Sequence, residues 1–166
     1  IKNTDNEILN FDKLTYASNN DNLSSLESSG KYGFEHGDIC DENTLTKTFN
    51  KFLPNIVVHF AAESHVDNSI NEPDSFISSN IIGTFNLLKI SLKYQLSDAV
   101  NDFKFIHIST DEVYGSIEHP ELFTENSPYR PNSPYSASKA ASDHLVRSWN
   151  KTYNLNTVIT NCSNNY

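Results

Sequence analysis

Three side chains that can move protons follow an apolar run near the middle of the chain. Thr110, Asp111 and Glu112 come directly after residues 103–108, which are rich in Phe and Ile. Two neighbouring carboxyl groups in a dry pocket do not both ionise easily, so their pKa values are pushed apart and one serves as an acid while the other serves as a base. The Thr110 hydroxyl can hold a substrate oxygen beside them. This group therefore predicts proton transfer on a small substrate.

A tyrosine and a lysine with helical spacing follow downstream. Tyr135 and Lys139 are four residues apart, which places both on one face of a helix. A phenol with a pKa of about 10 is a poor base at neutral pH, but a nearby cation favours the phenolate. We expect Lys139 to lower the pKa of Tyr135, which then takes a proton from a substrate hydroxyl. Alone, the pair is more typical of an ordinary exposed helix.

The surrounding pattern alternates strands with helices, which is typical of a parallel α/β sheet. Open parallel sheets place their sites at the carboxyl ends of the strands, where residues 110–112 lie. Asp41 is a candidate N-cap, and His59 inside a strand is expected to be a core histidine. We expect strands at 7–11, 32–36, 55–60, 103–109 and 156–160, and helices at 23–27, 41–53, 73–94 and 133–153.

Composition narrows the class of protein. The 166 residues are 37% apolar and carry a net charge of -9, so the chain is one domain or part of one, and nucleic acid is not an expected partner. No apolar run approaches the roughly 18 residues of a membrane span, and no signal-peptide pattern opens the chain, which predicts a cytoplasmic protein without membrane contact. Cys40, Cys162 and the scattered histidines show no metal-ligand spacing, so we expect free thiols and no metal site.

Asp12 follows the first predicted strand and is a candidate cofactor ligand. In a dinucleotide-binding fold, an acidic residue at the end of the second strand holds the adenosine ribose hydroxyls and repels a 2'-phosphate. Asp12 therefore favours NAD over NADP, although a surface Asp in a turn has the same appearance. Ala61 and Ala62 follow another strand and are small enough to let a cofactor lie close.

Five segments together resemble the dTDP-glucose 4,6-dehydratases, a family of extended short-chain dehydrogenases/reductases. The similarity runs almost from end to end. The segments are 12–17 (DKLTYA), 61–67 (AAESHVD), 109–115 (STDEVYG), 133–139 (SPYSASK) and 160–166 (TNCSNNY).

The resemblance implies a set of binding residues. It places Asp38 against the adenine amine and Ile39 against the adenine face, although Asp38 is also a candidate helix N-cap. Ser79 stands where the family usually has threonine on the nicotinamide side. The implied NAD positions are Asp12, Lys13, Leu14, Thr15, Asp38, Ile39, Phe60, Ala61, Ala62, Ser64, Ser79, Tyr135, Lys139 and Asn165, and the implied substrate positions are Ser64, Thr110 and Asn164.

The resemblance also implies a reaction. Tyr135 and Lys139 assist oxidation at C4 of the glucose ring, Glu112 removes the C5 proton, Asp111 protonates the departing C6 hydroxyl, and the hydride returns from NAD to C6. The product is dTDP-4-keto-6-deoxyglucose. A UDP-glucose 4,6-dehydratase, another nucleotide-sugar epimerase or dehydratase, and an inactive piece that only binds ligand all stay open.

The predicted fold is a Rossmann-like, doubly wound parallel sheet of which the chain holds a part. No Gly-rich phosphate-binding turn occurs in residues 1–166, so we expect the first strand and that turn upstream of Ile1 and a substrate domain beyond Tyr166. Residues 1–166 then form a partial NAD-binding domain from strand 2 to about strand 6. Without the first strand, the strands at 7–11 and 55–60 lack their shared neighbour, so we expect the chain alone to be inactive.

The predicted helix at 73–94 is apolar on more than one face. A helix of this kind is buried on more than one side, and one domain covers only one of them. We therefore expect a homodimer formed through the helices at 73–94 and 133–153, with Gly83 allowing the partner to come close.

Overall fold

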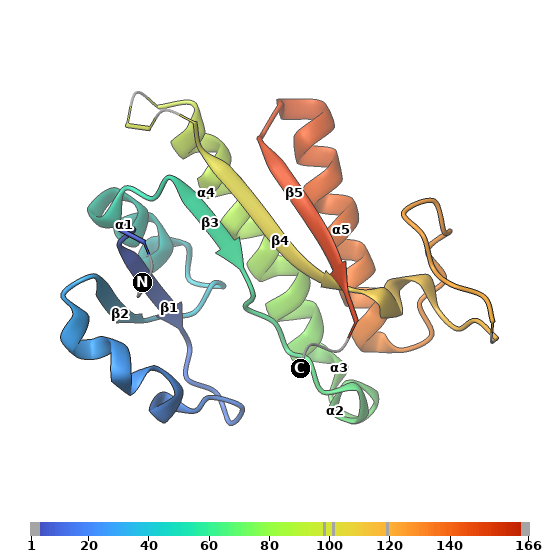
Figure 1. The fold of residues 1–166 in the computed structure, drawn as a ribbon. Helices are drawn as coiled ribbons and strands as arrows, with labels where there is room; N and C mark the ends of the chain where they lie inside the picture. Colours follow the sequence, from blue (N-terminus) through green and yellow to red (C-terminus); the bar gives the residue numbers. More distant parts are fainter. Residues whose placement is uncertain (1–3, 98, 101, 119, 164–166) are drawn as a thin grey trace.

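The computed structural model describes residues 4–97, 99–100, 102–118 and 120–163, apart from the side chains of Asn20 and Glu27. Its strands form two parallel sheets (Figure 1). In the first, β1 (Ile8–Asp12) pairs with β2 (Tyr32–His36). In the second, β4 (Lys104–Thr110) lies between β3 (Ile56–His59) and β5 (Thr157–Cys162). The predicted α/β class is confirmed, and each predicted strand is present with bounds shifted by at most two residues.

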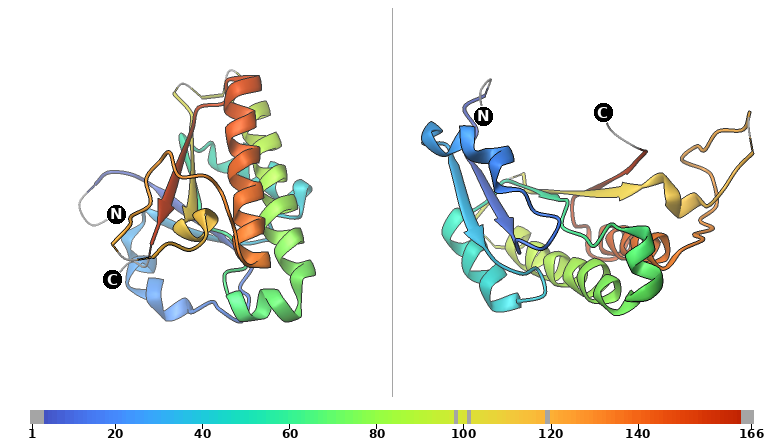
Figure 2. Two further views of the ribbon diagram at one scale, coloured as in Figure 1. Left: turned by 90° about the vertical axis from the view of Figure 1, so that its right-hand side faces the viewer. Right: turned by 90° about the horizontal axis from the view of Figure 1, so that it is seen from below.

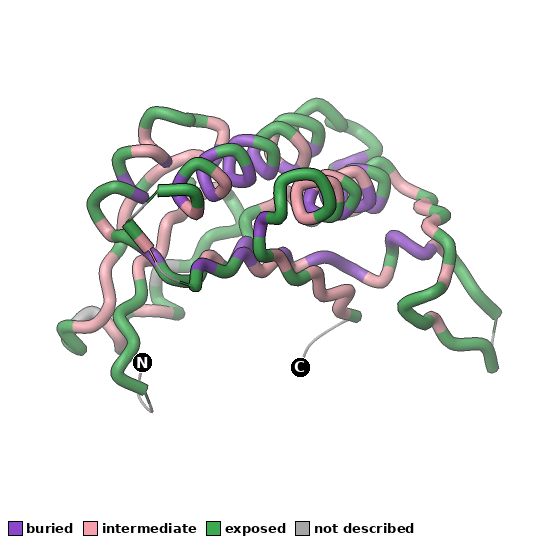
Figure 3. The backbone as a smooth tube through the Cα atoms, turned by 90° about the horizontal axis from the view of Figure 1, so that it is seen from above, coloured by how far each residue is buried: buried purple, intermediate pink, exposed green. Residues whose placement is uncertain are grey.

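Three helices cover one face of the strand layer. They are α1 (Glu42–Phe52), α4 (Thr84–Gln95) and α5 (Pro134–Tyr153) (Figure 2). Buried positions gather on their inner sides and along β4 (Figure 3). Leu88 of α4, Phe105 of β4, Val146 of α5 and Leu155 after α5 are all fully buried there. The apolar core therefore lies between these helices and the β3–β4–β5 sheet.

Local capping explains where α1 and α5 begin. The Asp41 side chain accepts hydrogen bonds from the amides of Asn43 and Thr44, which confirms it as an N-cap. Ser133 caps α5 through a reciprocal capping box with Ser136. Pro134 then occupies the first turn of α5, where a missing amide proton costs nothing. The helix that carries Tyr135 and Lys139 is thus fixed at the end nearest the site.

The predicted helix at 73–94 is a continuous helical run with a π-helical middle. It consists of α3 (Pro73–Phe76), the π-helical segment η2 (Ile77–Gly83) and α4. Gly83 is buried against the Ile39 side chain, and a methyl group in its place would collide with Ile39. The expectation that Gly83 lets a partner subunit approach is therefore wrong, because the close contact is made within the chain.

Three further short elements are only partly foreseen by the sequence pattern. The 3₁₀ helix η1 (Asn20–Ser29) extends beyond the predicted 23–27. The helix α2 (Val66–Asn71) and the 3₁₀ helix η3 (Asp111–Tyr114) are additional. Both follow strand ends and contain polar residues, so they carry little of the apolar periodicity on which helix prediction depends.

One face of the β3–β4–β5 sheet is open among the described residues. Ile56 is 55% exposed, Val58 46% and Val158 42%. The continuous β-branched run of 55–60 is typical of a strand buried on both faces, but Ile56 and Val58 are exposed on the open face. The two sheets are not hydrogen-bonded to each other, and β1 and β3 are the strands at the facing edges.

Candidate active site

Strand β4 delivers the three predicted proton-transfer residues at its carboxyl end. Thr110 caps η3, since its hydroxyl accepts a hydrogen bond from the Glu112 amide at 3.2 Å. The same hydroxyl lies 3.3 Å from Asp111 Oδ1 and donates to it. The turn of η3 therefore holds one hydroxyl and two carboxyl groups together at the strand end.

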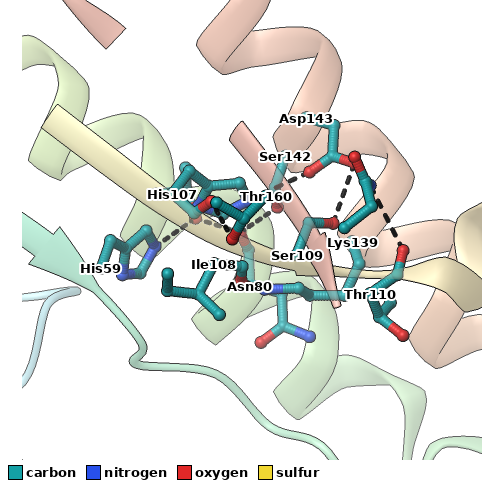
Figure 4. A network of polar contacts seen from close by, with 12 residues as sticks. His59, Asn80, His107, Ile108, Ser109, Thr110, Lys139, Ser142, Asp143 and Thr160 are labelled. Carbon is teal, nitrogen blue, oxygen red and sulfur yellow. Dashed lines mark hydrogen bonds and ion pairs between the residues drawn. The ribbon is translucent and has the colours of Figure 1, made fainter. Parts of the chain in front are cut away.

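Helix α5 brings Tyr135 and Lys139 to the same end of the sheet. The Lys139 side chain is only 4% exposed, and its Nζ donates to the carbonyl oxygen of Ile108 at 2.7 Å (Figure 4). Burial lowers the pKa of Lys139 to about 8, against a smaller raising effect of the Asp143 carboxylate. A lysine in this setting loses its proton only a little above neutral pH.

The expected lowering of the Tyr135 pKa by Lys139 is wrong for this structure. Burial raises the pKa of Tyr135 above its ordinary value, and the charges of Glu112 and Asp111 add to that effect. The nearby Thr110 hydroxyl acts in the opposite direction. The Lys139 ammonium is engaged by the Ile108 carbonyl, so the phenol is in a setting that favours its protonated form.

Glu112 is a stronger base than an ordinary glutamate. Partial burial raises the pKa of Glu112, and the neighbouring Asp111 charge raises it further. The sequence predicts such mutual influence for adjacent carboxyl groups. The raised pKa suits Glu112 to removing a proton from carbon.

A groove runs between β1 and β3 along the length of both strands and opens at their carboxyl ends beside residues 37–39, which follow β2. Its cavity volume is ≈ 390 Å³. At its rim, Asp12 Oδ1 accepts hydrogen bonds from the Leu14 amide at 2.7 Å and from the Ser18 hydroxyl at 3.5 Å. The predicted cofactor positions that line the groove are Asp12, Lys13, Thr15, Asp38, Ile39, Phe60, Ala61, Ala62 and Ser79.

An ion pair joins two of these positions. Lys13 Nζ lies 2.7 Å from Asp38 Oδ2, and the Cys40 amide donates to Asp38 Oδ1 at 2.8 Å. Burial alone raises the pKa of Asp38, but Lys13 and the Cys40 amide outweigh it, so the pKa lies below its ordinary value. Asp38 is therefore held as a carboxylate. The N-cap of α1, which was the alternative role for Asp38, is Asp41.

The remaining predicted positions lie apart from this groove. Leu14, at φ 53°, lines a neighbouring cavity between β1 and η1, and Ser64 is exposed on the loop before α2. Asn164 and Asn165 lie outside the described residues. Cys40 and Cys162 are free and partly buried.

Sequence reasoning missed Asn80 of the π-helical segment. Its buried carboxamide accepts from the Glu63 amide at 2.8 Å, and it donates to the Glu63 carbonyl at 2.9 Å and to Ser138 Oγ at 2.8 Å. Asn80 thereby joins the loop after β3 to α5. An asparagine inside an apolar helical run was the available signal, because such a side chain needs buried partners.

The part of the chain that the structure describes has neither a metal-binding cluster nor a membrane span. No group of three or more His, Cys, Asp and Glu side chains there is placed to hold a metal ion. None of the helices in that part of the chain has both the length and the apolar character needed to cross a membrane.

The parallel strands, the acidic strand-end residue Asp12 and the Tyr135/Lys139 pair define the class of Rossmann-like short-chain dehydrogenases/reductases. Within that class, the chain belongs to the GDP-mannose 4,6-dehydratase family, whose model matches residues 2–166.

Known proteins of several organisms are similar to this chain. The dTDP-glucose 4,6-dehydratase of Salmonella typhimurium is 53% identical over 178 residues, covering 100% of this chain and 49% of the relative. A dTDP-glucose 4,6-dehydratase of Streptomyces venezuelae, crystallised with NAD, superposes with a TM-score of 0.88 at 43% identity, covering 97% of this chain and 47% of that one. The UDP-glucose 4-epimerase of Thermus thermophilus, in complex with NAD, gives a TM-score of 0.80 at 29% identity, covering 93% and 46%. The chain thus spans about half the length of the curated relatives it matches.

Proposed function

We propose that the protein is an NAD-dependent dTDP-glucose 4,6-dehydratase. One observation carries this proposal: the Asp111–Glu112 pair stands at the end of β4 within electrostatic reach of Tyr135. Oxidation at C4 alone needs only a tyrosine base. Elimination of water across C5 and C6 needs a further base and a further acid, and the adjacent carboxyl groups supply both.

The carboxyl end of the groove between β1 and β3 fits the adenosine end of NAD. In it, Asp12 is placed to hold the ribose hydroxyls and Asp38 the adenine amine, while exposed Ala61 leaves room for the cofactor backbone. When bound, NAD supplies a reversible two-electron oxidant that is regenerated within each turnover. Lys13, Leu14, Thr15, Ile39, Phe60, Ala62, Ser64, Ser79, Lys139 and Asn165 complete the proposed set.

The residues at the end of β4 and on α5 carry out the proton transfers. Tyr135, after losing its own proton against its raised pKa, takes the proton of the C4 hydroxyl while Thr110 holds the same oxygen. Once C4 is a ketone, the C5 proton is acidic and Glu112 removes it. Asp111 gives its proton to the C6 hydroxyl, which leaves as water. Burial, the main cause of the raised pKa of Glu112, makes its carboxylate a stronger base and does not depend on the charge of Asp111.

The nucleotide is the second part of the proposal. Similarity to dTDP-glucose enzymes at 53% and 43% identity supports thymidine over uridine, compared with 29% for a UDP-sugar enzyme. Ser64, Thr110 and Asn164 are the proposed substrate contacts. A cytoplasmic location stays a prediction, as does the inactivity of the 166-residue chain by itself.

A homodimer through the helical run 73–95 and α5 is the proposed assembly. Three large apolar side chains on that run support it, because Ile77 and Ile82 are each 48% exposed and Phe85 is 36% exposed. The Phe85 ring packs edge-on against Trp149 of α5 at 5.8 Å between centroids, so the apolar surface continues onto the second helix. Light scattering should give twice the chain mass, and Phe85→Glu should give the single mass.

Solvent deuterium tests the reaction. A chimera is made in which this chain replaces the matching half of the Salmonella typhimurium relative, and it is incubated with dTDP-glucose in heavy water without added NAD. We expect a product that has lost one water and carries one deuterium at C5, placed there by exchange at Glu112. An isomer of unchanged composition contradicts the dehydratase, and turnover of UDP-glucose alone keeps the mechanism and changes the substrate. The Glu112→Gln chimera is the control and should give neither water loss nor deuterium.

A further inference from the structure

A buried carboxylate lies one helical turn beyond Lys139 and has no part in the proposed proton transfers. Asp143 on α5 is 1% exposed. Its Oδ2 accepts from Ser109 Oγ at 2.8 Å, from the Tyr129 hydroxyl at 2.8 Å and from Asn161 Nδ2 at 3.3 Å. His107 Nε2 lies 3.2 Å from its Oδ1 (Figure 4). The Asp143 carboxyl group thus contacts side chains from β4, β5 and the 116–133 loop.

Hydrogen bonds from neutral donors do not by themselves balance the negative charge of Asp143. Burying a carboxylate is costly unless it is paired as well as hydrogen-bonded. His107 does not supply the positive charge, because burial and the Lys139 charge outweigh the effect of Asp143 and keep the pKa of His107 below its ordinary value. Lys139, four residues earlier on the same helix face, is the buried cation whose charge Asp143 does stabilise.

Asp143 and Lys139 also attach α5 to the last residues of β4. Lys139 donates to the carbonyl oxygen of Ile108, and Ser109 donates to Asp143. These two bonds fall on neighbouring residues of β4, immediately before Thr110 (Figure 4). The Lys139–Ile108 and Ser109–Asp143 bonds therefore help to set the position of the Thr110–Glu112 turn relative to Tyr135.

We propose that Asp143 is a positioning residue of the active site, which provides a buried negative charge one helical turn from Lys139 and holds the end of β4 in place against α5. Asp143 touches none of the reacting atoms and acts through Lys139 and Ser109. Its effect on turnover rests on the proposed function, whereas its effect on Lys139 does not.

Several titratable groups face this pair from other elements. His107 of β4 and His59 of β3 both have lowered pKa values, for which burial is the main cause and the Lys139 charge a further one. Tyr129 of the 116–133 loop has a raised pKa, from burial and from Asp143. These groups are neutral near pH 8, so a titration at that pH belongs to Lys139 itself.

The test is a pH titration of the 166-residue chain carrying lysine labelled with ¹³C at Cε, with the Lys139 signal assigned by its loss in Lys139→Arg. In the unmodified chain we expect a midpoint near 8. In Asp143→Asn, which removes the charge at nearly constant shape, the midpoint should fall by about one pH unit. The matched control Ser109→Ala removes one hydrogen bond but keeps the charge, and its midpoint should stay near 8. Equal midpoints in Asp143→Asn and the unmodified chain overturn the proposal.

A second measurement needs no substitution at Asp143. In the chain labelled with ¹³C at the aspartate carboxyl carbons, the Asp143 signal should move with the same midpoint as Lys139, and a flat signal around pH 8 overturns the proposal. In the chimera, Asp143→Asn should shift the alkaline limb of the kcat profile to lower pH by about one unit with little change in KM. An inactive unmodified chimera counts against the proposed function only, because the two titrations still decide the role of Asp143.

Discussion

The two faces of the β3–β4–β5 sheet do not divide into an apolar covered face and a polar open face, because polar side chains join Phe105 and Val57 on the covered face. On the face covered by α4 and α5, His59, His107 and Ser109 are at most 5% exposed. On the open face, Ile56, Val58 and Val158 are at least 42% exposed. Half-buried sheets ordinarily turn their apolar residues inward and their polar residues outward.

The polar side chains on the covered face show where the specific structure lies. Several of them have a defined polar neighbour, although His107 forms no hydrogen bond through either ring nitrogen. His59 Nε2 lies 2.9 Å from Thr84 Oγ1, and Ser109 bonds to Asp143. Such a network fixes one arrangement of the helices, because every wrong arrangement leaves buried polar atoms unpaired. The covered face is therefore suited to positioning a site, and the open apolar face is a surface that further packing would bury.

The largest effect is expected from removal of the buried Lys139 charge on the covered side of the sheet. Lys139→Met keeps the length and apolar stem of the side chain but removes the buried ammonium that donates to the Ile108 carbonyl and belongs to the proposed NAD-binding set. In the chimera we expect kcat to fall by about 10²- to 10⁴-fold, measured as water loss from dTDP-glucose. Lys104→Met, an exposed lysine at the start of β4, is the control and should stay within about twofold of the parent. A comparable loss in both variants would contradict a special role for the covered lysine.

Two adjacent valines compare the faces directly. Val57 packs against the main apolar cluster under the helices, whereas Val58 points to the open face and is 46% exposed. We expect Val57→Ala to lower the free energy of unfolding by about 1–2 kcal/mol through lost burial and a small cavity. Val58→Ala should change it by less than about 0.5 kcal/mol. Urea unfolding of the 166-residue chain measures both, and equal losses would mean that the open face is also packed.

The sequence predicts the strands more fully than it predicts their surroundings. The run 55–60 is rich in β-branched residues, which predicts a strand but does not say which face is covered. Residues 110–112, Tyr135 and Lys139 could be assigned to one site because strand ends and helical spacing bring them together. Asp143 continues that helical spacing from Lys139, yet its role depends on Tyr129 and Asn161, which come from a loop and a strand that no local pattern connects to it.

The pH dependence of activity tests whether Glu112 is the base and Asp111 the acid at the end of β4. Burial and the Asp111 charge raise the pKa of Glu112, and the proposed base must be deprotonated. Activity should therefore rise with pH through a midpoint above that of an ordinary glutamate. Asp111→Asn removes one raising influence, so the acid limb of its kcat profile should move to lower pH, even though the level of activity falls. An acid limb that stays in place or moves upward would contradict this division.

The smallest effect is expected from the exposed Lys13–Asp38 ion pair in the groove. It contrasts with the buried charges of Lys139 and Asp143. Lys13 Nζ lies 2.7 Å from Asp38, but the Lys13 side chain is 57% exposed and water competes for both charges. We expect Lys13→Ala to lower the free energy of unfolding by less than about 1 kcal/mol. Because the folded-state pKa of Asp38 is lowered, the contribution is present above the ordinary Asp pKa and is lost as pH falls through the lowered value. Urea unfolding at pH 7 and at pH 3 should therefore show a smaller difference between parent and variant at the lower pH. A loss above about 2 kcal/mol at pH 7, with Lys104→Ala unchanged, would place the groove pair among the buried pairs instead.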